Sequence, residues 1–88
     1  MKKKILAFNV NEMENKLLIP TGAKVLSVVL KEDKSIVYLL ADEENGLEER
    51  MFVNVVADYV MDFADGKERK FIGSYLQDFV VYHLFELI

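Results

Sequence analysis

The chain has 88 residues, of which 52% are hydrophobic, a formal net charge of −4 and no cysteine. This length predicts one domain over residues 1–88, and the missing cysteine excludes disulfides, thiolate catalysis and zinc sites of the cysteine type. The acidic balance argues against generic binding to duplex nucleic acid, whose nonspecific affinity comes mainly from Lys and Arg.

The amino terminus carries Lys2-Lys3-Lys4 ahead of the apolar stretch Ile5 to Phe8. A secretory signal needs an apolar stretch of about 7 to 15 residues, and a membrane span needs about 18. This segment and every other apolar run are too short for either role. We therefore expect a strand with a basic lead-in, in a cytosolic protein that does not contact a membrane.

Short runs of β-branched and aromatic residues, bounded by turn-forming residues, recur along the whole chain. Pro20 cannot donate to a strand ladder, so it ends the second run and begins a turn with Thr21-Gly22. We expect a hairpin loop over residues 31–35 and a turn at Gln77-Asp78. The predicted strands cover residues 3–10, 16–19, 24–30, 36–41, 49–56, 69–76 and 79–87.

The segment before the sixth predicted strand is open to two interpretations. Tyr59, Val60 and Phe63 are spaced three and four residues apart, so one helical turn near residues 58–64 and an ordered loop both fit. Seven short strands without a long helical period predict an all-β, mainly antiparallel domain, arranged as a sandwich or a partly open barrel.

Several predicted strands are apolar on both faces. In residues 79–87 one face is apolar except for His83, and the other face is amphipathic to apolar. Residues 24–30 and 36–40 repeat this pattern. A two-layer domain of this size leaves its outer faces in water, and a contiguous apolar surface usually marks an interface. We therefore predict a homo-oligomer, since symmetric self-association is the commonest way to cover such a surface.

The sequence offers little catalytic chemistry. His83 is the only histidine, and Ser27, Ser35 and Ser74 do not lie in a nucleophile-elbow context. The glycines form no phosphate-binding loop. We predict a protein that is not an enzyme and holds no metal and no cofactor. His83 is interpreted as a hydrogen-bonded core or interface residue, with a ligand-binding role as the alternative.

The only arginines are the strongest candidates for binding an anion, because guanidinium pairs with phosphate or carboxylate through two parallel hydrogen bonds. The alternative is that they form ion pairs with the nearby Glu48, Glu49 and Glu68. Tyrosine rings could stack on a base, Tyr75 among them. The predicted ligand-binding set is Arg50, Arg69, Lys70, Tyr82 and His83.

Residues 18–28 read Leu-Ile-Pro-Thr-Gly-Ala-Lys-Val-Leu-Ser-Val, with an apolar residue, Pro, any residue and Gly-Ala before a strand that ends in Ser-Val. This resembles short proteins of tailed bacteriophages and prophages that carry a small all-β domain of unknown function. Further similar segments are Lys3-Lys4-Ile5, Glu48-Glu49-Arg50 with Phe52, Phe71-Ile72-Gly73 and Tyr82-His83-Leu84-Phe85-Glu86-Leu87. The family's Gly-Thr-Gly turn and His-Pro are replaced here by residues 54–61.

The resemblance implies a phage origin and a β fold, and transfers no activity. It raises the expectation of a non-enzymatic accessory protein in the bacterial host cytoplasm that blocks or sequesters a host defence component. The target would be a host protein or a small anionic nucleotide signal. The alternative is a structural or assembly protein of the phage particle.

Overall fold

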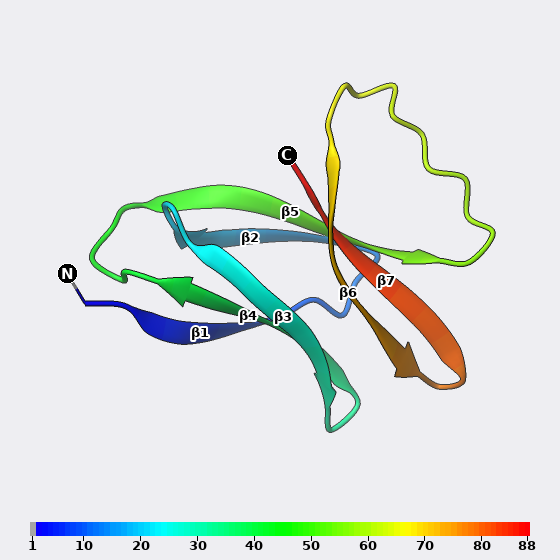
Figure 1. Ribbon diagram of the computed structural model, residues 1–88, viewed down its shortest axis with the longest axis horizontal. Coiled ribbons are helices and arrows are strands. Elements are labelled where there is room, and N and C mark those ends of the chain that lie inside the picture. Colours follow the sequence, from blue (N-terminus) through cyan, green and yellow to red (C-terminus); the bar gives the residue numbers. More distant parts are fainter. Residues whose placement is uncertain (1) are drawn as a thin grey trace.

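The computed structural model describes residues 2–88 and contains seven strands and no helix in this range (Figure 1). The all-β prediction is therefore confirmed. None of the described residues forms a helix that could span a membrane. The strands are β1 (Lys4–Asn9), β2 (Glu14–Pro20), β3 (Lys24–Lys31), β4 (Lys34–Ala41), β5 (Leu47–Val56), β6 (Arg69–Gln77) and β7 (Val80–Leu87).

The strands form two antiparallel sheets and not a closed barrel. One sheet has the order β1-β4-β3 and the other β2-β5-β7-β6. Strands β3 and β6 lie close together where the two sheets meet. A Cβ atom added to Gly73 in β6 would lie only 3.0 Å from Cγ1 of Val28 in β3. A larger residue here would require the Val28 side chain to shift by a few tenths of an ångström, so the close approach of the two strands favours glycine.

The core lies between the sheets and uses every second residue of the strands, since successive side chains point to opposite faces. Two groups of buried side chains share Phe8, Leu17 and Val25 as partly buried neighbours. The buried members are Val10, Val37, Phe52 and Leu84 in one group and Ile19, Ala23, Leu39 and Ala41 in the other.

A buried polar network ties the β1–β2 connection to the rest of the domain. Asn54 in β5 donates from Nδ2 to the carbonyl oxygens of Val10 and Glu12, both at 2.8 Å. Its Oδ1 accepts a hydrogen bond of 2.6 Å from the hydroxyl of Tyr75 in β6. Burial raises the pKa of Tyr75. The segment between β1 and β2 is thus held by side-chain amides where no ladder partner is available.

Two hairpins have tight two-residue turns in which both residues have positive φ. These are Glu32 and Asp33 (φ 50° and 62°) and Asp78 and Phe79 (φ 51° and 67°). The predicted turn at Gln77-Asp78 is wrong by one residue, and β7 starts at Val80. Turns of this kind match the right-handed twist of the flanking strands, which outweighs the reluctance of a bulky residue to adopt positive φ.

Residues 57–68 form a loop, so the prediction of one helical turn near residues 58–64 is not realised. The reason is local hydrogen bonding by aspartate. The Asp62 carboxylate accepts from the backbone N–H of Ala64, and that of Asp65 accepts from the N–H of Lys67, each at 2.9 Å. These contacts offer the backbone an alternative to helical hydrogen bonds.

Candidate binding surface

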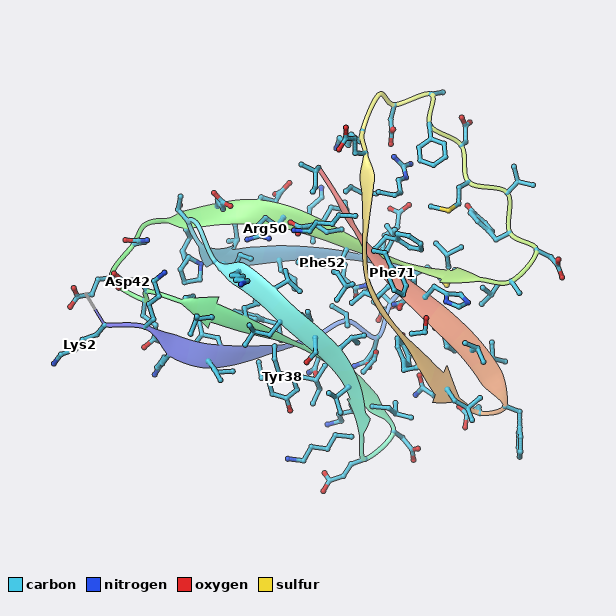
Figure 2. All side chains as sticks on the ribbon, in the orientation of Figure 1. Lys2, Tyr38, Asp42, Arg50, Phe52 and Phe71 are labelled. Carbon is cyan, nitrogen blue, oxygen red and sulfur yellow. The ribbon has the colours of Figure 1, made fainter. Side chains whose placement is uncertain are left out.

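Arg50 projects from β5 toward the region between the sheets (Figure 2). Its guanidinium donates to both carboxylate oxygens of Glu86 in β7, at 2.5 and 2.8 Å, and to the carbonyl oxygen of Ala23 at 2.6 Å. The side chains of Arg50 and Glu86 are only 17% and 6% exposed. The hydrogen bonds to Glu86 outweigh the effect of burial and raise the pKa of Arg50.

Arg69 is also occupied, at the start of β6. Its guanidinium donates to both carboxylate oxygens of Asp65, at 3.0 and 3.1 Å, and to the carbonyl oxygens of Lys67 and Asp62. It also lies 4.9 Å from the centre of the Phe63 ring. These contacts fasten the 57–68 loop to the sheet, and they use most of the donors that an anion would need.

The expected carboxylate partners of the arginines were largely wrong. Of the three glutamates named from sequence, only Glu48 forms an ion pair with an arginine, and its oxygen lies 4.0 Å from the guanidinium of Arg50. The main partner, Glu86, is opposite Phe52 in the β5–β7 ladder, and Phe52 is two residues from Arg50. Such diagonal neighbours share a face, but sequence proximity does not reveal them.

The five predicted ligand-binding residues do not converge on one site. Arg50 and Lys70 line one open hollow, together with carboxylates of Glu48 and Glu86. Arg69 lines a separate hollow under the 57–68 loop. Tyr82 stacks on Tyr75, with ring centres 5.4 Å apart, and its neighbour His83 projects to the opposite face of the sheet.

One contact that the sequence did not predict joins Ser74 and His83, which are opposite each other in the β6–β7 ladder. The Ser74 hydroxyl lies 2.6 Å from Nδ1 of His83. No carboxylate among residues 2–88 hydrogen-bonds this histidine. The pair satisfies two polar groups on an otherwise apolar face.

That apolar face is the most conspicuous feature of the surface. We define the β6–β7 apolar surface as the outward side chains of this hairpin, where Phe71 faces Phe85 and Leu76 faces Val81 across the ladder. The Phe71 and Phe85 rings meet edge to face, 5.4 Å apart. Phe71, Leu76 and Val81 are all exposed, and the surface ends in Phe79 at the hairpin tip. Figure 2 shows Phe71 at the base of this hairpin, where β6 crosses β7.

Phe79 is fully exposed and has positive φ, 67°. The left-handed conformation costs an ordinary residue about 1–2 kcal/mol, and the ring gains no burial inside the domain. The corresponding position in the β3–β4 turn is Asp33, a residue type that tolerates this conformation. The two tips are in contact, because Gln77 Nε2 donates to the Asp33 carbonyl oxygen at 2.7 Å. The β3–β4 turn thus consists of two charged residues, whereas the β6–β7 turn consists of a charged residue, Asp78, and an aromatic one, Phe79.

Sequence alternation indicated the outward apolar residues of β7, but not the position of Phe79. An aromatic residue in a tight turn runs against local preference, so the sequence pattern predicts Phe79 as the first residue of a strand. Comparisons with protein-family models, curated proteins and solved structures found no match to this chain. Within residues 2–88, no three carboxylate or imidazole side chains are grouped as metal ligands would be.

Proposed function

We propose that this chain is a non-enzymatic phage accessory protein, acting as a homo-oligomer in the host cytoplasm, that blocks a host defence protein through its β6–β7 apolar surface. The observation that carries the proposal is Phe79, an aromatic side chain held in an unfavourable backbone conformation and fully exposed to water. Strained residues that the fold itself does not need are concentrated at functional sites. The phage context rests on the sequence resemblance described above.

The chemistry of the surface favours a protein partner. Exposed aromatic side chains on an apolar surface are typical of interface anchors that fill a pocket on the partner. The patch lies on a paired hairpin, so its shape is formed before binding and little ordering cost remains. The partner is therefore expected to offer an apolar cavity that accepts the ring of Phe79.

A small nucleotide signal is the less favoured target. Both guanidiniums are already held by carboxylates and carbonyl oxygens, and the hollow beside Arg50 is lined by acidic side chains as well as by Lys16 and Lys70. Calorimetric titration of cyclic dinucleotides into the purified protein tests this alternative. A micromolar affinity that is lost in Lys70→Ala would favour nucleotide sequestration over protein binding.

The central experiment compares Phe79→Gly with Asp33→Gly, which change the same position in two similar turns. Protein purified from infected cells is used to capture host proteins, and each identified partner is then titrated in pure form. We expect Phe79→Gly to fold and to weaken binding at least about 30-fold, since a hot-spot side chain contributes 2 kcal/mol or more. Asp33→Gly should bind like wild type. Equal affinity in all three proteins would contradict the proposal.

The second candidate function is a structural or assembly role in the phage particle. The exposed apolar face supports this structural role as well as it supports the blocking role, because such a face would be covered in a permanent assembly. Mass spectrometry of purified particles distinguishes the two functions. Stoichiometric protein in the particle would favour the structural role, whereas its absence from particles and presence in the cytoplasm of infected cells would favour the blocking role.

A further inference from the structure

The free edge of the three-stranded sheet is β1, which pairs only with β4. In Figure 1 β1 lies at the lower left, and no other strand is drawn along its outer side. The opposite edge of the same sheet is β3, which lies against β6. The backbone groups on the open side of β1 therefore face water, in a strand that is regular over six residues.

The hydrogen-bond pattern identifies which backbone groups these are. Val10 donates from its N–H to the carbonyl oxygen of Ser35 at 2.9 Å. In an antiparallel ladder, hydrogen-bonded pairs alternate with non-bonded pairs. The N–H and C=O groups of residues 4, 6 and 8 therefore also point toward β4. Those of Ile5, Ala7 and Asn9 point away from the sheet.

This edge lacks the usual protection against strand addition. Natural edges are blunted by proline, bulges or charged side chains along the strand. The free edge of the other sheet, β2, contains Pro20 and exposes Glu14 and Lys16. From Ile5 to Asn9, β1 has neither a charge nor a bulge. Its basic residues lie only at the beginning, in Lys2 to Lys4.

The geometry points to antiparallel pairing of β1 with β1 of a second copy of this chain, with the twofold axis at Ala7. This inference rests on the oligomeric part of the proposed function and identifies its interface. In this register Ile5 exchanges hydrogen bonds with Asn9 of the second copy, and the small Ala7 side chains meet at the axis. The two sheets of type β1-β4-β3 would then form one continuous sheet of six strands.

Charge complementarity selects a second copy as the occupant. Antiparallel pairing about Ala7 brings the basic residues Lys2 to Lys4 of one copy into contact with the carboxyl end of β1 of the other copy, where the β1–β2 connection carries Glu12. The contact is made twice by symmetry. A parallel arrangement would instead place Lys2 to Lys4 of both copies together, and like charges in register oppose pairing.

The chain contains no cysteine, so a single introduced thiol tests the register directly. Hydrogen-bonded antiparallel pairs have Cα atoms about 5.5 Å apart, within the range of about 4.4–6.8 Å that a disulfide spans. We expect full-length Ala7→Cys to form a covalent dimer under mild oxidation at micromolar concentration. Ala64→Cys, in the exposed 57–68 loop, is the matched control and should remain largely monomeric on denaturing gels.

A proline variant tests the same edge without introducing a reactive thiol. The N–H of Ala7 points away from β4, so Ala7→Pro removes an edge donor and leaves the ladder within the chain intact. We expect a folded protein whose dissociation constant for self-association rises at least 10-fold by sedimentation. Phe8→Pro, which removes a donor to β4, should lose the fold.

The outcomes distinguish this inference from the proposed function. Equal cross-linking of the Ala7 and Ala64 cysteine variants, or unchanged self-association in Ala7→Pro, would overturn pairing through β1. A wild-type protein that sediments as a monomer at 100-fold higher concentration than the cross-linking assay would overturn it as well. Partner binding lost in Phe79→Gly would still support the proposed function in each of these cases.

Discussion

The Arg50–Glu86 pair shows how a residue can resemble a ligand-binding group in sequence and serve the fold in the structure. Both side chains lie between the sheets, and the guanidinium satisfies both carboxylate oxygens of Glu86. Desolvation of two charges offsets much of their attraction, so such a pair adds little net stability. Replacing only one of the two residues, however, leaves the other as a buried charge without a partner.

We therefore expect Arg50→Ala to lower the free energy of unfolding by about 3 kcal/mol, because Glu86 loses its counter-ion. The double variant Arg50→Met with Glu86→Leu should recover most of this loss, since no unpaired charge remains. Urea unfolding followed by circular dichroism measures both values. A double variant as unstable as the single one would show that the pair itself, and not the orphaned carboxylate, determines stability.

At the scale of the strand, a bulge decides which apolar residues are buried. The β3–β4 register shifts between Val25 and Ser27, so Leu26 in between is turned outward and is 44% exposed. Leu84 in β7 is completely buried. Simple alternation indicated the apolar character of both strands but not the bulge, and it therefore gave no reason to separate these two leucines.

Substitution by aspartate should affect stability very differently at the exposed Leu26 and at the buried Leu84. Leu84→Asp is expected to unfold the domain, because a buried unpaired charge costs several kcal/mol, comparable to the whole stability of a small domain. Leu26→Asp should remain folded, with a loss of about 1 kcal/mol or less. Thermal unfolding of both variants checks the difference. A folded Leu84→Asp variant would mean that the assigned inner face of β7 is wrong.

The 57–68 loop is the other element whose structure depends on contacts that the sequence does not reveal. Hydrogen bonds from Arg69 hold the pKa of Asp65 below its ordinary value of 3.8. A carboxyl group with a depressed pKa in the folded state contributes stability above the unfolded pKa, and this contribution is lost as the pH falls through the folded pKa. The loop should accordingly loosen in acid.

We expect the amide of Lys67, which donates to Asp65, to lose hydrogen-exchange protection below a pH of about 3.8. Asp65→Asn should show weak protection at every pH, because a neutral amide pairs poorly with guanidinium. The amide of Phe52 in the core serves as the reference for global unfolding. Identical pH dependence of the two amides in wild type would contradict local opening.

The fold class could be predicted because strand alternation and turn residues are local signals, and they recur along the whole chain. The seven strands were located within about two residues of their observed bounds. The candidate surface was only partly predictable, since Phe79 occupies a turn against its own preference. The partners of Arg50 and Arg69 depend on ladder register and loop closure, which bring distant residues together.

At the scale of the whole molecule, the two proposals place self-association and partner binding on different elements. The β1 edge belongs to the three-stranded sheet, whereas the β6–β7 apolar surface belongs to the four-stranded sheet. A dimer joined through β1 therefore keeps two copies of the apolar surface free. Binding to a partner that is itself oligomeric or densely arranged then becomes bivalent, and the second contact forms at a high effective concentration.

This arrangement predicts that affinity and avidity respond to different substitutions. On a densely immobilised partner, Ala7→Pro should dissociate about 10- to 100-fold faster than wild type, because each chain binds alone. Its affinity for the same partner free in dilute solution should be unchanged, since the β6–β7 apolar surface is intact.

Phe79→Gly should weaken binding in both formats while its self-association stays at the wild-type level. Surface plasmon resonance at high and low partner density, combined with calorimetry, measures all of these quantities. Equal dissociation rates for Ala7→Pro and wild type on the dense surface would show that dimerisation through β1 adds nothing to partner binding.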